Sequence, residues 1–409
     1  MKIQLIQPPL NKGYQTNARS GCYAPLGLVT IATFLKKRKP NLEVEVLDGE
    51  LLTLKEIKEK IDPDAILGLE TKIHNYESAI EIASLGNKTI IGGVFASSMY
   101  KQIQKHRKIF DHIIIGPGSY AILDILNGRK DKIISGKGKI LPISFPDRSF
   151  INLEDYMNNF KKQHPTWDFN ATNINTNFGC LYDCYFCGRS TPNGKVTYRN
   201  PKDIWKEVEH LIKDYSVNYL VDFSESITSN TKWLESLLES KPNNINPFIH
   251  AFANVSHINE YTIKILKKLN VKHLFIGAES GNNDQLRELR KNFSVKKTLE
   301  AIKLSTDYEI EITPSFVLGL KGETEEKLKK TYEHAKRIKE ISYFEEIFCS
   351  SLIPFPDTDA FRKIEHKLPD TDLYDPENLK KIWNEENCNV NLKKINSTVD
   401  DITNLAKYK

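Results

Sequence analysis

The stretch GCLYDCYFCG, residues Gly179–Gly188, decides how this chain is interpreted. It holds Cys180, Cys184 and Cys187 in the spacing C-x3-C-x2-C. The run Thr172–Thr176 just before it predicts a strand, so the three cysteines lie on the loop that leaves this strand. Active-site loops of β/α barrels follow the carboxyl ends of strands, and we therefore expect a functional site at this loop.

Three cysteines placed this closely are most simply explained as metal ligands. A [4Fe–4S] cluster normally takes four thiolates, so three would leave one iron open to another ligand. A structural zinc site takes four ligands, typically as two spaced pairs. His164 and His210 lie well outside the loop, and no other cysteine or histidine stands at zinc spacing. The sequence therefore favours an iron–sulfur cluster over zinc, and over cysteines gathered by packing alone.

Length and composition indicate a globular protein with several domains. The 409 residues are 40% hydrophobic and 27% charged, which excludes a wholly disordered chain. The net charge of +5, from 58 basic and 53 acidic residues, is too small to indicate nucleic acid as a partner. No uncharged apolar run reaches the roughly 18 residues of a membrane span, and the start MKIQLIQPPL is too short for a signal peptide. The apolar core of that start is the part that is too short, and the start is instead interpreted as a first strand. We therefore expect a cytoplasmic protein with reduced cysteines and no membrane span.

Residues 1–140 alternate short apolar runs with amphipathic runs, which is typical of a parallel sheet covered by helices. This pattern predicts a doubly wound, Rossmann-like α/β domain of the flavodoxin-like kind. Residues 141–170 lose the alternation, contain prolines and are interpreted as a linker. The strands predicted in the first domain are Ile3–Gln7, Val44–Leu47, Ala65–Leu69, Thr89–Gly92 and His112–Gly116.

Residues 171–360 resume the alternation with six β/α units, which predicts a partial (β/α)6 TIM barrel. Residues 361–409 are charged and rich in asparagine, with weak helical patterns, and we expect a short, mostly helical extension. The strands predicted in the barrel are Thr172–Thr176, Tyr219–Phe223, Phe248–Ala253, His273–Ile276, Ile312–Val317 and Ile347–Leu352.

The cysteine motif, with Phe186 just before its last cysteine, resembles the signature of the radical S-adenosylmethionine (SAM) superfamily. The resemblance implies that Cys180, Cys184 and Cys187 hold a [4Fe–4S] cluster whose open iron binds SAM. It also implies reductive cleavage of SAM to a 5′-deoxyadenosyl radical. By the same resemblance, the backbone around Phe186 would meet the adenine of SAM.

Further motifs extend the resemblance along the barrel. Ser224-Glu225 stands where relatives often carry two acidic residues, so Glu225 is expected to bind the ammonium group of SAM. The run from Ile276 through Glu279 and Ser280 to Gly281 resembles the family's G-x-E-S-G, whose polar side chains approach SAM. Two late motifs depart from the family pattern, with Lys321 in place of proline and Asp357 in place of glycine.

The first domain resembles the N-terminal domain of the cobalamin-binding branch of that superfamily. Ile91-Gly92-Gly93-Val94 is similar to the branch's fourth-strand motif, in which Gly92 and Gly93 would make room for the corrinoid tail. The D-x-H-x-x-G motif that supplies a histidine ligand to cobalt is absent, and His74 is interpreted as an ordinary loop histidine. The resemblance to this branch makes cobalamin an expected cofactor. Because the cobalt-ligand motif is absent, a purely structural role for this domain stays open.

The main functional prediction is a radical SAM enzyme that methylates an unactivated carbon with the help of cobalamin. One alternative is a cobalamin-independent radical SAM enzyme that performs rearrangement, oxidation or carbon–carbon bond formation. Another is a non-catalytic iron–sulfur protein. A tRNA methylthiotransferase is disfavoured, since its N-terminal domain would carry cluster cysteines and this one holds only Cys22.

The substrate is not specified by any motif, and a small molecule, a lipid or a peptide all stay open. The resemblance implies an external electron donor, such as a flavodoxin or a ferredoxin.

Overall fold

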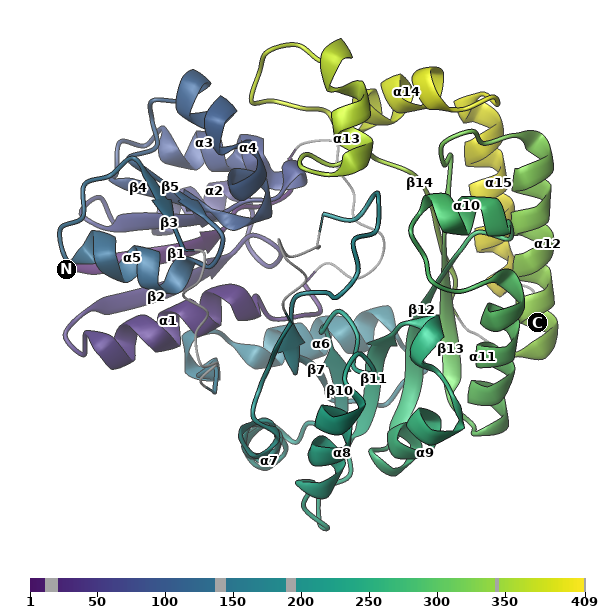
Figure 1. The fold of residues 1–409 in the computed structure, drawn as a ribbon. Coiled ribbons are helices and arrows are strands. Elements are labelled where there is room, and N and C mark those ends of the chain that lie inside the picture. Colours follow the sequence, from purple (N-terminus) through teal and green to yellow (C-terminus); the bar gives the residue numbers. More distant parts are fainter. Residues whose placement is uncertain (12–20, 137–144, 189–195, 343–345, 408–409) are drawn as a thin grey trace. The chain divides into compact units, whose positions relative to one another are not determined.

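The computed structural model describes residues 1–11, 21–136, 145–188, 196–342 and 346–407. They divide into two compact units (Figure 1). In this part of the chain, no helix is both long enough and apolar enough to cross a membrane. Unit 1 comprises Met1–Asn173, His210–Ser216 and Pro369–Asp375, and unit 2 comprises Ile174–Glu209, Val217–Leu368 and Pro376–Lys409.

Unit 1 is built on a six-stranded parallel sheet with the strand order β2-β1-β3-β4-β5-β6. The first five strands follow the flavodoxin-like order, as predicted, and β6 extends the far edge. The short β6 was not predicted from the sequence. The strands are β1 Lys2–Gln7, β2 Glu43–Asp48, β3 Ile66–Glu70, β4 Thr89–Gly92, β5 His112–Ile115 and β6 Ile133–Ser135.

Helices connect these strands, and α1 and α5 share a core with one face of the sheet. Ile3 and Leu5 of β1 pack in that core with Leu35 of α1 and Ile122 of α5. The parallel, helix-connected sheet confirms the doubly wound architecture expected from the sequence. The helices of unit 1 are α1 Leu26–Arg38, α2 Leu54–Lys60, α3 Tyr76–Ala83, α4 Gly93–His106, α5 Gly118–Leu126 and α6 Leu153–Gln163, with 3-10 turns η1 Ile73–Asn75 and η2 Arg148–Phe150.

The stretch interpreted as a linker, residues 141–170, contains helix α6. Leu153, Tyr156, Met157 and Phe160 are buried in the structure. Their spacing of three and four residues is that of the apolar face of an amphipathic helix. The first unit therefore continues through this helix to Asn173.

The segment Pro369–Asp375 belongs to unit 1, although it follows the barrel in the sequence. Asp372 is 1% exposed and accepts a hydrogen bond of 2.7 Å from the hydroxyl of Tyr76. The same carboxylate lies 2.7 Å from Nε of Arg107, at the end of α4. A buried carboxylate with two such donors anchors this segment to α3 and α4.

Unit 2 contains a six-stranded sheet with the strand order β14-β13-β12-β11-β10-β7, whose strands β10 to β14 pair in parallel. The sheet curls into a half barrel, and helices cover its outer face (Figure 1). This confirms the predicted partial barrel. The strands are β7 Ala171–Ile174, β10 Tyr219–Asp222, β11 Phe248–Ala253, β12 Val271–Glu279, β13 Glu311–Leu318 and β14 Phe348–Ser351.

The C-terminal extension is mostly helical, as expected, and α15 packs against β14 and α12. The helices of this unit are α8 Thr231–Glu239, α9 Glu260–Lys268, α10 Asn283–Glu288, α11 Val295–Asp307, α12 Glu325–Ile341, α13 Asp359–Ile364, α14 Pro376–Asn387 and α15 Leu392–Asn404, with α7 Pro201–Tyr215 shared between the units and 3-10 turns η3 Val255–His257, η4 Glu365–Lys367 and η5 Leu405–Lys407.

Candidate functional site

The cysteine loop is closed at its base by a small antiparallel pair, β8 Asn177–Phe178 and β9 Thr197–Tyr198. Gly179 opens the loop with φ +88°, a left-handed conformation that favours glycine. Beyond β9, Arg199 forms a buried ion pair of 2.6 Å with Glu207 of α7. Both ends of the loop are therefore fixed to the barrel.

Side chains inside the loop bind it to later parts of the barrel. The hydroxyl of Tyr182 lies 2.9 Å from Nε2 of His257, which is in the turn after β11. Tyr185 is buried, and its ring lies 5.8 Å from that of Trp383 in α14. These contacts hold the loop between two distant segments of unit 2.

The three thiols lie within electrostatic range of one another. Burial raises the pKa of the Cys180 and Cys184 thiols, and Cys187 raises that of Cys180 further. The amide of Cys187 donates a 3.0 Å hydrogen bond to the carbonyl of Cys184.

The spacing of these thiols bears on which metal group they could hold. Within the described ranges, no three cysteine, histidine, aspartate or glutamate side chains converge tightly enough for one metal ion. A [4Fe–4S] cluster does not need that convergence, because each thiolate binds a different iron. Three neighbouring thiols on one loop could each bind a different iron of such a cluster.

Lys291 lies beside the cysteines, although no motif of the sequence indicates it. Its ammonium is 2.7 Å from Oε1 of Glu279 and 5.7 Å from the centre of the Phe186 ring. Burial opposes the charge, but the carboxylate of Glu279 and the thiols of Cys184 and Cys187 raise the pKa of Lys291 overall. A permanent positive charge is therefore held against the cysteine loop.

Glu279 ends β12 in an unusual conformation. Its φ is +61°, in the left-handed region that non-glycine residues rarely adopt. The side chain turns back along the strand, so that a β-carbon on Gly277 would lie less than 3.0 Å from its Oε1. The absence of a side chain at Gly277 thus leaves space for the Glu279 carboxylate, which explains why the motif has glycine at this position.

Ser280 and Ser224 have their side chains engaged within the protein. Ser280 is buried and its hydroxyl donates to Oε1 of Gln285 at 2.6 Å. Ser224 is buried as well, and it donates to Oδ1 of Asp222 at 2.6 Å. Glu225, next in the chain, is half-buried and acts electrostatically on Cys180. Of these predicted SAM ligands, Glu225 and Glu279 lie nearest the cysteines, and the role of Ser280 stays a prediction.

The inner face of the half barrel carries aromatic side chains below this site. Residues opposite one another in a parallel sheet point to the same face, and Phe252 pairs with Phe275 across β11 and β12. Their rings lie 4.8 Å apart, and the ring of Phe348 on β14 lies 5.4 Å from that of Phe275. Along β12 the same face presents His273, then Phe275, then Gly277. An aromatic surface therefore leads up the strand towards Glu279.

In unit 1, Gly92 and Gly93 lie at the carboxyl end of β4. A β-carbon on Gly93, whose φ is +94°, would lie 2.6 Å from the backbone of Thr71, so the close approach of Thr71 requires this glycine. A β-carbon on Gly92 would meet only Ile114, at 3.8 Å, which leaves room there. Val94 beside them is 59% exposed. These residues fit a bulky ligand over the end of β4.

The predicted loop histidine, His74, lies in the turn after β3. It is half-buried, and its pKa is lowered by burial and by Lys72. Its carbonyl accepts a 2.7 Å hydrogen bond from the amide of Asn11.

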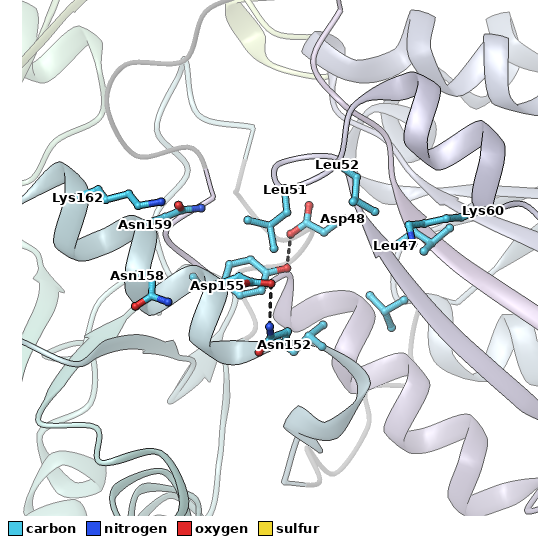
Figure 2. A pocket seen from close by; sticks show the side chains of 13 residues that line it. Leu47, Asp48, Leu51, Leu52, Lys60, Asn152, Asp155, Asn158, Asn159 and Lys162 are labelled. Carbon is cyan, nitrogen blue, oxygen red and sulfur yellow. Dashed lines mark hydrogen bonds between the residues drawn. The ribbon is translucent and has the colours of Figure 1, made fainter.

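A pocket of about 500 Å³ lies at the carboxyl end of β2 and against α6 in unit 1 (Figure 2). Asp48 accepts a 2.7 Å hydrogen bond from the hydroxyl of Tyr156 at its inner wall. Burial raises the pKa of Asp48 to about 6, although the bonds from the amide of Glu50 and from Tyr156 act in the opposite direction. Lys60 and Lys162 lie towards opposite sides of the pocket (Figure 2).

Comparison with known proteins places these features in a family. The model of the radical SAM superfamily matches residues 174–335, which include the cysteine loop and strands β10 to β13. Residues 174–335 thus form a radical SAM domain. A domain of this superfamily implies a [4Fe–4S] cluster and SAM as cofactors.

Relatives of known sequence or structure extend the likeness beyond the radical SAM region. The anaerobic magnesium-protoporphyrin IX monomethyl ester cyclase of Rubrivivax gelatinosus is 24% identical over 367 residues, which cover 82% of this chain and 66% of the cyclase. The chain thus spans just under two thirds of that relative. An uncharacterized methyltransferase of Pyrococcus horikoshii is 23% identical over 386 residues, which cover 88% of this chain and 82% of the relative.

The fold of both units occurs in a solved radical SAM enzyme. The radical SAM methyltransferase TsrM from Kitasatospora setae, with cobalamin and a [4Fe–4S] cluster bound, matches with a TM-score of 0.71. It is 15% identical, and the match covers 90% of this chain and 78% of TsrM. Each unit thus has a fold found in this solved enzyme, as the sequence led us to expect.

The structure also accounts for one departure from the family motifs. Asp357 stands where the family pattern has glycine, and its φ is +68°. The backbone thus keeps the left-handed conformation that glycine favours, which aspartate tolerates better than most residues.

Proposed function

We propose that Cys180, Cys184 and Cys187 hold a [4Fe–4S] cluster and that the enzyme is a cobalamin-dependent methyltransferase acting on an unactivated carbon. The observation that carries this proposal is the fixed three-cysteine loop on a parallel half barrel, in a chain that also has the doubly wound unit. When bound, the cluster and SAM supply a carbon-centred radical, and cobalamin supplies a methyl group.

The residues around the cysteines would position SAM. Phe186 would face the adenine, and Glu225 would receive the ammonium group, since it already acts on Cys180. Glu279 would present its carboxylate from a fixed position because Gly277 leaves it space and Lys291 holds it at 2.7 Å. Ser280 would contribute through the backbone turn that it stabilises with Gln285.

Unit 1 would hold cobalamin at the carboxyl ends of its strands, where ligands of doubly wound domains bind. Gly92 supports this assignment because a side chain is missing where space is open, and Gly93 because it lets α4 begin close to Thr71.

The substrate would lie on the inner face of the half barrel, beneath Glu279. The rings of Phe252, Phe275 and Phe348 favour a substrate with an apolar body among the small molecules, lipids and peptides that the sequence leaves open. The electron for SAM cleavage would come from an external low-potential donor such as a flavodoxin or a ferredoxin.

Metal analysis of protein reconstituted without oxygen, with iron, sulfide and hydroxocobalamin, tests the proposal. We expect about four irons and one cobalt per chain, and 5′-deoxyadenosine after addition of SAM and dithionite. Cys184→Ala should lose the iron, whereas Cys388→Ala, in the C-terminal extension, should keep it. Iron without cobalt would exclude methyl transfer through cobalamin and favour another radical reaction. Zinc without iron would refute the whole assignment.

A further inference from the structure

Lys291 is a buried cation on the segment between α10 and α11. Its side chain is only 11% exposed, and that of its partner Glu279 is 8% exposed. Burying an ammonium group is costly unless it is paired, and lysine is among the residues least often buried. A buried lysine in this position therefore needs a reason beyond surface solubility.

The ion pair with Glu279 does not account for all of its contacts. The ammonium also lies 5.7 Å from the centre of the Phe186 ring, inside the cysteine motif. Its charge acts on Cys184 more strongly than the opposing charge of Glu279 does. It acts on Cys180 and Cys187 as well. Lys291 thus attracts the negative charge of a Cys184 thiolate more strongly than Glu279 repels it.

We propose that Lys291 is a positioning residue that holds the Glu279 carboxylate above Gly277 and raises the reduction potential of the cluster bound by the cysteines. This inference rests on the proposed function, since it requires that the three thiolates hold a [4Fe–4S] cluster. It assigns a role to a residue that lies outside the cysteine motif and the G-x-E-S-G motif.

Reduction of the cluster adds one electron to it. An external low-potential reductant gives one electron to the cluster, no bond breaks, and the negative charge in the loop increases by one. A fixed cation nearby stabilises the more negative form, and it does so strongly where water is excluded. The buried ammonium of Lys291 therefore makes reduction easier, whereas the carboxylate of Glu279, whose charge acts less strongly on Cys184, opposes it.

Redox titration of the reconstituted protein, followed by electron paramagnetic resonance, tests this without measuring activity. Lys291→Met, which keeps the length but removes the charge, should lower the potential by at least about 59 mV, a tenfold change in the one-electron equilibrium. Lys291→Arg should restore most of the potential. Glu279→Gln should shift it in the opposite direction. Lys296→Met, at a lysine that is 87% exposed, serves as the matched control and should leave it unchanged.

The outcomes separate this inference from the proposed function. Lys291→Met protein that carries a full cluster at the wild-type potential would overturn the role of Lys291 and leave the radical enzyme intact. Should Lys291→Met fail to fold, as judged by circular dichroism, Lys291→Gln decides: a lowered potential supports the inference and an unchanged potential overturns it. Wild-type protein without iron would refute both.

Discussion

The carboxylate of Glu279 occupies the space in which Gly277 would otherwise carry a side chain, since a β-carbon there would lie less than 3.0 Å from Oε1. Glu279 has a positive φ and pairs with Lys291 at 2.7 Å. Two residues of one motif on β12 and a lysine from a later loop thus depend on one another. The arrangement places this ion pair beside the cysteine loop at the end of β12.

Gly277→Ala is expected to displace the Glu279 carboxylate while the fold survives, because the obstructing atom is the end of a flexible side chain. Overpacking of this kind costs about 1–3 kcal/mol, which denaturant unfolding would measure. The cluster potential should also move, since Glu279 and Lys291 separate. Gly27→Ala, in α1 with nothing within 4 Å of the new carbon, should be neutral or slightly stabilising. Equal effects of both substitutions would contradict the steric argument.

Asp372→Ala should destabilise unit 1 strongly. The substitution leaves the buried hydroxyl of Tyr76 and the guanidinium of Arg107 without their shared carboxylate. Loss of one partner of a buried charged pair costs about 3 kcal/mol or more, and thermal and denaturant unfolding should show it. Asp370→Ala is the matched control two residues away. Asp370 is 61% exposed and pairs with Lys105 and His106 at the surface, so its removal should change stability little.

His334 should make the protein less stable in acid. Burial, with a smaller contribution from Arg337, lowers its pKa to about 4 from an ordinary value of 6.5. Neither ring nitrogen has a hydrogen-bond partner among the described residues. The unfolded chain binds the proton more readily, so stability is complete above pH 6.5 and falls by about 3 kcal/mol as the pH drops through 4. His334→Leu should remove that slope in unfolding measurements across this range, and an unaltered slope would disprove the assignment.

Asp48 should make the protein less stable as the pH rises, which is the opposite of the effect of His334. Its pKa is raised to about 6 from 3.8, chiefly by burial, so the folded state binds the proton more readily. Its contribution to stability is complete below pH 3.8 and is lost as the pH rises through 6, a difference of about 3 kcal/mol. Asp48→Asn keeps a carbonyl oxygen for the hydroxyl of Tyr156 and should stabilise the protein at pH 7 but not at pH 4. Asp155→Asn, at the exposed rim of the same pocket, should show no such pH dependence (Figure 2).

Much of the fold was predictable because strands and helices carry their own periodicity. The predicted strand Ile312–Val317 is β13, Glu311–Leu318, and the predicted helix Leu26–Lys37 is α1, Leu26–Arg38. The elements that were not predicted are those whose sequence pattern is weak or was misjudged. β6 has only three residues, and the apolar face of α6 was present in the sequence but was masked by the prolines and charged residues around it.

The candidate site was predictable only in part. The spacing of the cysteines indicates their chemistry because ligands of one cluster must be close together, and a loop brings them together locally. Glu225 and Glu279 were identified through family motifs, and both lie near the cysteines. Lys291 was not identified, since no local pattern distinguishes it from the many other lysines of the chain.

The local chemistry of this protein is encoded in short stretches of sequence: three thiols on one loop, glycines at the ends of strands, and the alternation that builds two parallel sheets. Which distant residues complete each site follows from the packing of the whole chain. Lys291 lies 107 positions from Cys184, and Asp372 lies 296 positions from Tyr76. Periodicity and spacing are encoded within short segments, whereas pairing over such separations follows from how the sheets and helices pack. The energetic effect of a buried charge depends on its partner, and the partner is known only once the chain is folded.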